Sequence, residues 1–219
     1  MAQSFLAALT PEEAADLEAA GRRRRYGADV TLFHEGDDAG PVIVLLSGRA
    51  KVAQLGAGGR EAIVALRGPG DLIGELSALD NGPRSSTVTT LEPVEALVLA
   101  GSAFAGLLER RPRLALVILR QVIGRLRYAD AQQAQFATHD VVGRVAERLL
   151  ELGERFGARD GGRIEIALPL SQEELAAWTG SSREAVSRAL QLFRSLKIVE
   201  TGRRRIVLLD PDALRRRAA

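Results

Sequence analysis

The longest regular pattern of apolar and polar positions lies between Pro112 and Ala137. This stretch has no proline after Pro112 and one internal glycine, Gly124, so it predicts a single helix of roughly seven turns. A heptad pattern that turns polar in its second half is formed by Leu116, Leu119, Ile123, Leu126, Asp130, Gln133 and Ala137. Two interpretations fit: parallel pairing of two such helices across a dimer axis, or one helix buried on a globular core.

Upstream of this helix the pattern changes twice. Residues 10–13, Thr-Pro-Glu-Glu, have the composition of a capped helix start, and Gly21 ends that helix. The basic run 22–25 follows and predicts a solvated surface. From about Tyr26 to Leu99, short apolar runs alternate with glycine-bearing turns, which indicates a small all-β sandwich or barrel.

One turn in this region, GELSALDNGPRSS from Gly74 to Ser86, has an unusual composition. Successive backbone N–H groups at such a turn form an anion-binding concavity, and Arg84 could add a charge-assisted contact to a phosphate. Glu75 offers two acceptors suited to a sugar hydroxyl. The alternative is an internal ion pair between Arg84 and either Glu75 or Asp80.

Downstream of the long helix, residues 138–140 form a candidate hinge between domains. Asp140 or Thr138 would cap an amphipathic helix over residues 141–156. Residues 157–162 then break the chain, and residues 163–168 alternate like a strand.

A helix-turn-helix pattern follows over residues 171–196. A capping box at 171–174 opens the first helix, a glycine-containing turn spans 179–182, and the second helix begins at Arg183. On the second helix, Val186, Leu190 and Phe193 can pack inward. The opposite side combines arginine, which can pair with guanine, and glutamate, which can accept a hydrogen bond from cytosine; its residues are Arg183, Glu184, Ser187 and Arg188.

Two features near this helix complete the pattern. Glu184 has an alternative role, since it could form a second capping box with Ser181. Residues 198–209 predict a hairpin with arginines at its tip, a wing suited to phosphate contact. The candidate DNA-binding residues are Ser171, Ser181, Ser182, Arg183, Glu184, Ser187, Arg188 and Arg203.

The charge distribution agrees with a polyanionic partner. The chain of 219 residues has a net charge of +2, but residues 1–137 are net −1 and residues 138–219 are net +3. For Arg215, Arg216 and Arg217 alone, a solubilising tail is the simpler interpretation.

Composition excludes several classes of site. The chain has no cysteine and two histidines, which excludes disulfides, thiolate zinc sites and cysteine-ligated clusters and leaves no histidine metal site. No nucleophile–base pair and no Walker lysine motif is found, so we expect no catalytic residue and no enzyme. No run of about 18 apolar residues and no leader pattern occurs, which predicts a cytoplasmic protein without membrane contact.

Nearly the whole chain resembles the CRP/FNR transcription regulators, and within them the cyclic AMP receptor proteins. LFHEGDDAG with the later Ser47-Gly48 is similar to the entry into the family's β-roll, GELSALDNGPRSS to its phosphate-binding cassette, and LSQEELAAWTGSSREAVSRAL to its helix-turn-helix. The resemblance implies an α+β chain with three parts. These are a cyclic-nucleotide-binding β-roll (a double-stranded jelly roll) over 1–111, a dimerisation helix over 112–137, and a winged helix-turn-helix over 138–219.

The same resemblance implies a homodimeric, allosteric DNA-binding regulator controlled by a small effector, with cyclic AMP as the first candidate and RNA polymerase as a further partner. Glu75 would bind the ribose hydroxyl, Arg84 and Ser85 the cyclic phosphate, assisted by the backbone of Gly74 to Leu76. The helix-turn-helix residues imply a palindrome with TGTGA-like halves, read by helices about 34 Å apart. The dimer interface would contain Leu116, Leu119, Ile123 and Leu126.

One departure from the family concerns the effector. Cyclic AMP receptors present a threonine and a serine or similar polar residue to the adenine, whereas this chain has Ala129 and Asp130. Ala129 offers no side-chain hydrogen bond, and ionised Asp130 only accepts. A regulator that responds to a different effector, or to none, is therefore the alternative. A cyclic-nucleotide module that regulates a partner protein is a third possibility.

Overall fold

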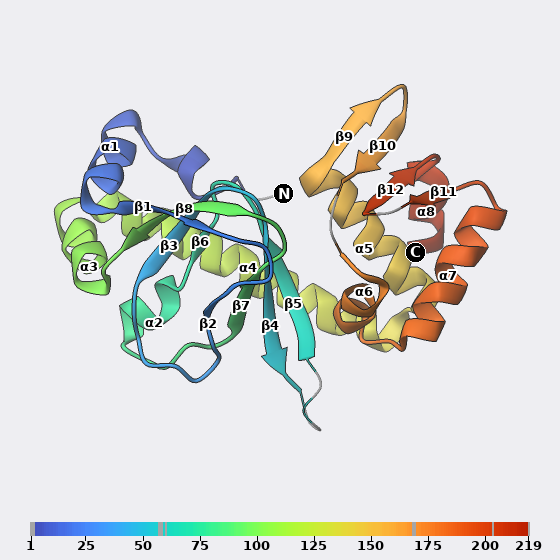
Figure 1. Ribbon diagram of the computed structural model, residues 1–219, viewed down its shortest axis with the longest axis horizontal. Helices are drawn as coiled ribbons and strands as arrows, with labels where there is room; N and C mark the ends of the chain where they lie inside the picture. Colours follow the sequence, from blue (N-terminus) through green and yellow to red (C-terminus); the bar gives the residue numbers. More distant parts are fainter. Residues whose placement is uncertain (1–2, 57–58, 60, 168–169, 203, 219) are drawn as a thin grey trace. The chain divides into compact units, whose positions relative to one another are not determined.

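The computed structural model describes residues 3–56, 59, 61–167, 170–202 and 204–218 and consists of two compact units, residues 1–129 and 130–219 (Figure 1). The division falls inside the long helix α4 (Pro112–Thr138), upstream of the hinge expected at residues 138–140. Each unit has its own core.

The first unit contains two four-stranded antiparallel sheets and the helices around them (Figure 1). One sheet has the order β1-β8-β3-β6, with β1 (Arg22–Tyr26), β8 (Val94–Leu99), β3 (Val42–Ser47) and β6 (Leu72–Ile73). The other has the order β2-β7-β4-β5, with β2 (Thr31–Phe33), β7 (Thr87–Thr90), β4 (Ala50–Leu55) and β5 (Glu61–Arg67). The helical elements are η1 (Leu6–Ala8), α1 (Pro11–Ala20), α2 (Glu75–Asp80), α3 (Gly101–Arg110) and the first part of α4.

Strand β3 contributes to two separate cores because successive side chains of a strand point to opposite faces. Ile43 and Leu45 belong to a cluster that also contains Val88 of the second sheet. Val42 and Val44 pack instead with apolar side chains of the helices, namely Leu17, Phe104, Leu107, Leu114, Val117 and Ile118. The start of α4 is therefore fixed to the sheet by its buried face.

The first strand starts earlier than the sequence pattern predicts. Residues 22–25 are the four consecutive arginines, and they pair with β8 in register from Arg22 opposite Val98 to Arg25 opposite Glu95. All four remain exposed, as expected for a solvated basic run. A strand at the edge of a sheet tolerates this composition, because charged side chains there discourage pairing with other chains.

The second unit packs helices against one antiparallel sheet of order β11-β12-β10-β9. Its elements are α5 (Val141–Phe156), β9 (Gly157–Asp160), β10 (Arg163–Ile166), α6 (Gln172–Thr179), α7 (Arg183–Ser195), β11 (Val199–Gly202), β12 (Arg205–Leu208) and α8 (Pro211–Ala218). Asp140 caps α5, since its Oδ1 accepts a hydrogen bond from the backbone N–H of Gly143 at 2.8 Å.

Two predictions about this unit are wrong. Residues 157–162 do not break the chain, because 157–160 form β9 and pair with β10 across a turn in which Gly161 and Gly162 have φ of +53° and +82°. Glycine is the residue that adopts such φ values without strain. The basic C-terminus is also not a tail, because it belongs to α8, whose Leu214 is buried while its three arginines stay exposed.

Two absences hold for the ranges given above. No helix there is long and apolar enough to cross a membrane. No group of three or more histidine or carboxylate side chains there could hold a metal ion.

Candidate effector and nucleic-acid sites

Arg84 is the buried centre of the candidate anion site, with 3% of the residue exposed. Its Nη1 donates to the carbonyl oxygen of Gly74 at 2.8 Å and to the hydroxyl of Ser77 at 2.6 Å. Its Nη2 donates to the carbonyl oxygen of Pro41 at 2.7 Å, and the guanidinium lies 4.2 Å from the centroid of the Phe33 ring. Two backbone carbonyls, one hydroxyl and the face of an aromatic ring therefore surround the positive charge of Arg84.

The alternative ion pair of Arg84 with Glu75 or Asp80 is not found. Within the described part of the chain, no carboxylate lies within ion-pair distance of Arg84. Burial lowers the pKa of the Arg84 guanidinium, while the charges of Asp37 and Glu75 act in the opposite direction. Arginine nevertheless stays protonated in proteins, so the site holds a buried positive charge that an anionic ligand would stabilise.

Backbone contacts fix the loop around this arginine. The N–H of Arg84 donates to the carbonyl of Asp37, and the N–H of Gly36 donates to the carbonyl of Arg84, each at 2.8 Å. Gly74 has φ +79°, and a Cβ there would lie 2.5 Å from Nη1 of Arg84. Glycine at this position is thus required both by the backbone conformation and by the close approach of the guanidinium.

Glu75 is also buried, with 2% exposed, but it is paired. Its carboxylate accepts a short hydrogen bond from Nη1 of Arg125 on α4, and Nη2 of Arg125 donates to the carbonyl of Leu72 at 3.0 Å. Sequence reasoning missed Arg125, because no local pattern places it beside Glu75.

The remaining predicted ligand residues are exposed. Ser85 and Leu76 are exposed, and the carbonyl of Ser85 accepts a hydrogen bond from Nε2 of Gln54 at 2.9 Å. Ala129 and Asp130 are exposed on α4 and fall on different sides of the division between the two units. Gln54 and Ser77 are further polar contacts of this region, and no sequence pattern singles them out.

Helix α4 has two apolar faces, and only one of them is covered in the single chain. Leu114, Val117 and Ile118 are at most 5% exposed in the core of the first unit. The predicted seam is open, with Leu116 and Leu119 53% exposed, Ile123 41% and Leu126 60%. One face of the helix is therefore buried on a core. The other face presents an exposed apolar stripe that a partner could cover.

The helix-turn-helix has both predicted helices. Oγ of Ser171 accepts from the N–H of Glu174 at 3.1 Å, and the Glu174 carboxylate accepts from the N–H of Ser171 at 2.9 Å, which confirms this capping box. The alternative box between Ser181 and Glu184 is not formed. Ser182 caps α7 instead, accepting from the N–H of Ala185 at 3.2 Å.

The two sides of α7 are oriented as the sequence predicts. Val186, Leu190 and Phe193 are buried, whereas Arg183, Glu184 and Arg188 are exposed and Ser187 is half-buried. Hydrogen bonds from the backbone N–H of Glu184 and from Ser182, with the charges of Arg183 and Arg188, lower the pKa of the Glu184 carboxyl. Glu184 is thus an ionised acceptor on an otherwise basic exposed face.

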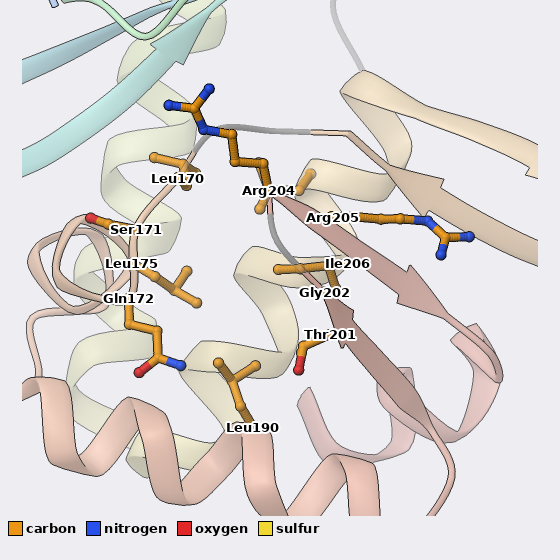
Figure 2. A pocket seen from close by; sticks show the side chains of 11 residues that line it. Leu170, Ser171, Gln172, Leu175, Leu190, Thr201, Gly202, Arg204, Arg205 and Ile206 are labelled. Carbon is orange, nitrogen blue, oxygen red and sulfur yellow. The ribbon is translucent and has the colours of Figure 1, made fainter.

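A cavity of about 80 Å³ lies between the start of α6, α7 and the hairpin β11–β12 (Figure 2). Figure 2 shows Arg204 and Arg205 pointing in opposite directions from this hairpin. Arg205 forms a bidentate ion pair with Glu165, at 2.7 and 2.9 Å. Arg203, the predicted wing contact, lies outside the described residues.

Comparisons with known proteins cover the domains that contain both candidate sites. Residues 23–111 match the model of the cyclic nucleotide-binding domain, and residues 143–217 match that of the Crp-like helix-turn-helix domain. The CRP-like cAMP-activated global transcriptional regulator of Mycobacterium tuberculosis is 36% identical over 188 residues, 86% of this chain and 84% of that protein.

Two further similarities cover most of the chain. The cyclic AMP receptor protein of Thermus thermophilus is 33% identical over 194 residues, 89% of this chain and 87% of that protein. The structure of FixK2 from Bradyrhizobium japonicum is 25% identical, with a TM-score of 0.79 over 91% of this chain and 98% of that one.

Proposed function

Because the chain belongs to the CRP/FNR family of DNA-binding transcription regulators, we propose that it is a homodimer whose affinity for DNA is set by a cyclic nucleotide bound beside Arg84. Its parts would be an effector domain over residues 1–111, a dimerisation helix over 112–137 and a winged helix-turn-helix over 138–219. The observation that carries the proposal is the buried Arg84, which has no carboxylate partner among the residues that the structure describes, next to the buried Glu75.

Each group at this site has a role in the proposal. The cyclic phosphate binds Arg84 and Ser85 with help from the backbone of 74–76, and the ribose hydroxyl binds Glu75. Cyclic AMP is the first candidate, since the relative from Mycobacterium tuberculosis is named as cAMP-activated. Asp130 could accept from an exocyclic purine amine, which leaves room for another amine-bearing nucleotide.

The DNA contacts come from the exposed side of α7 and its surroundings. Base edges are read by Arg183, Glu184 and Arg188. The DNA around those bases is contacted by Ser171, Ser181, Ser182, Ser187 and the wing arginine Arg203. Two subunits paired through the open seam of α4 would present two such helices to a palindrome with TGTGA-like halves. Acting in the cytoplasm, the dimer would also meet RNA polymerase.

The mechanism is a population shift. Ligand favours one of two arrangements of the dimer, and that arrangement binds DNA more tightly. Ligand and DNA must then strengthen each other's binding by the same factor.

Calorimetry with cyclic AMP, cyclic GMP and cyclic di-GMP, followed by duplex titration with and without the ligand that binds, tests this proposal. Equal DNA affinity in both conditions would reject allosteric control by that ligand. The second candidate, a regulator with another effector or none, is favoured by Ala129 and Asp130 and predicts DNA binding without response to these nucleotides.

A further inference from the structure

Arg144, in the first turn of α5, connects three places in the second unit. Its Nη1 donates to the carbonyl of His139 at 2.8 Å, and its Nε donates to the carbonyl of Thr179 at 2.9 Å. Its Nη2 donates to Oγ of Ser181 at 3.1 Å. A single side chain thus joins the α4–α5 junction to the turn of the helix-turn-helix.

The acceptors explain why an arginine occupies this position. His139 follows the last residue of α4, and Thr179 is the last residue of α6, so both carbonyls lie at helix ends where intrahelical donors run out. A cation near such carbonyls is favourable. Reaching both carbonyls and a hydroxyl at once requires the planar fork of a guanidinium, because an ammonium is a compact point donor.

A second contact links the same places. The guanidinium of Arg144 lies 5.4 Å from the centroid of the Phe136 ring, near the end of α4. A Cβ on Gly180 would lie 2.8 Å from Cε1 of Phe136, and Gly180 has φ +58°. The ring therefore packs directly on the glycine of the turn, and any larger residue there would displace it.

This cluster immediately precedes the DNA-reading end of α7. Ser182, the cap of α7, follows Ser181, and Arg183 and Glu184 come next. We infer that Arg144 is a positioning residue for DNA recognition, which holds the turn so that the start of α7 is presented in one orientation. This inference rests on the proposed function and adds to it a residue outside the base-reading set. Three of the five N–H groups of Arg144 donate to protein acceptors.

The test compares Arg144→Lys with Arg155→Lys, both in the full-length chain. Arg155 is a matched control, since it lies at the other end of α5 with its own carboxylate partner, Glu151, and ring contact, Phe156. Affinity for a duplex with TGTGA-like halves is measured over a series of salt concentrations. Amide hydrogen exchange over residues 180–185 and fluorescence of Trp178, the single tryptophan, report the order of the turn.

For Arg144→Lys we expect affinity to fall about tenfold at every salt concentration, because charge-assisted hydrogen bonds are lost. The slope of log affinity against log salt stays unchanged because lysine keeps the charge. Exchange over residues 180–185 becomes faster, and Arg155→Lys behaves as wild type. Weaker binding with exchange over residues 180–185 unaltered would identify Arg144 as a direct DNA contact and overturn the inference. Unchanged affinity would also overturn it.

Phe136→Leu is the second variant, for the case that Arg144→Lys fails to fold. Phe136 is 46% exposed, so its replacement should leave the unit folded while loosening the contact with Gly180. We expect a smaller loss of affinity with the same unchanged salt slope, and wild-type affinity in this variant would contradict the inference. If wild-type protein binds no duplex, the proposed function fails, whereas exchange over residues 180–185 still tests whether Arg144 orders the turn.

Discussion

The buried carboxylate of Glu75 and the partly exposed guanidinium of Arg125 form an ion pair that joins the short helix α2 to the long helix α4, across 50 residues of sequence. Arg125 also holds the carbonyl of Leu72, the first residue of β6. A ligand hydroxyl that binds Glu75 would change the charge environment of Arg125, and through it the attachment of α4. The pair therefore connects the candidate effector site to the proposed dimer helix.

Replacing Glu75 with glutamine should weaken cyclic nucleotide binding by about tenfold or more, because a charge-assisted hydrogen bond becomes a neutral one. Calorimetry measures the change. Asp80→Asn is the control, since Asp80 is an exposed carboxylate at the other end of the same helix. Wild-type affinity in Glu75→Gln would show that the ligand does not use this carboxylate.

A charge in the open seam of α4 should separate the dimer. Leu119 is 53% exposed in the single chain, so Leu119→Glu leaves the monomer fold intact but places two carboxylates at the paired surface. Sedimentation should show a monomer, while the same change at Leu196, 44% exposed at the end of α7, should leave the dimer in place. If both variants sediment like wild type, the seam is not the interface.

Two variants should distinguish a residue that reads a base from a residue that contacts phosphate. Glu184→Ala should lower discrimination at one base pair of each half-site by about 1–3 kcal/mol. Arg204→Ala, on the wing, should weaken binding to all sequences alike and reduce the salt slope by about 1. Competition between duplexes with single base-pair changes measures both effects, and a uniform loss in Glu184→Ala would argue against base contact.

A substitution at Asp130 tests the role of this acidic residue, which stands where the family has a neutral polar one. If two Asp130 side chains approach each other in the ligand-free dimer, their repulsion holds it in an inactive arrangement. Asp130→Asn should then raise DNA affinity without ligand, by several-fold in a fluorescence anisotropy titration. No change in either ligand affinity or DNA affinity would mean that Asp130 only faces water.

Stability at low pH should depend on Glu13. The hydrogen bond from the backbone N–H of Thr10 lowers the pKa of the Glu13 carboxyl, burial opposes this, and Arg113 adds to the lowering. Because the folded pKa lies below the unfolded one, this stabilisation is present above the unfolded pKa and is lost as pH falls through the folded pKa.

Glu13→Gln should therefore cost roughly 1 kcal/mol at neutral pH, the size of a capping contribution, and make stability less dependent on pH in the acid range. Urea unfolding between neutral and acid pH measures this. Glu12→Gln, at an exposed carboxylate, should behave like wild type. If the stability of Glu13→Gln falls at acid pH as steeply as that of wild type, other groups cause the pH dependence.

The sequence by itself determined the features that depend on neighbours along the chain. The capping boxes at Thr10 and Ser171 and the inward side of α7 are short-range hydrogen bonds and periodic burial, so three or four residues suffice to specify them. The long helix, the glycine turns of the sheets and the order of the two motifs follow in the same way.

Only the tertiary structure decided which distant groups meet. Arg84 bonds to Pro41 and Gly74 and not to a carboxylate, Glu75 faces Arg125, and Arg144 bridges His139, Thr179 and Ser181. Strand β9 depended equally on a partner, β10, to satisfy its backbone groups. A side chain's sequence neighbours fix its direction on a helix or strand, but the groups that it meets are set by how the elements pack.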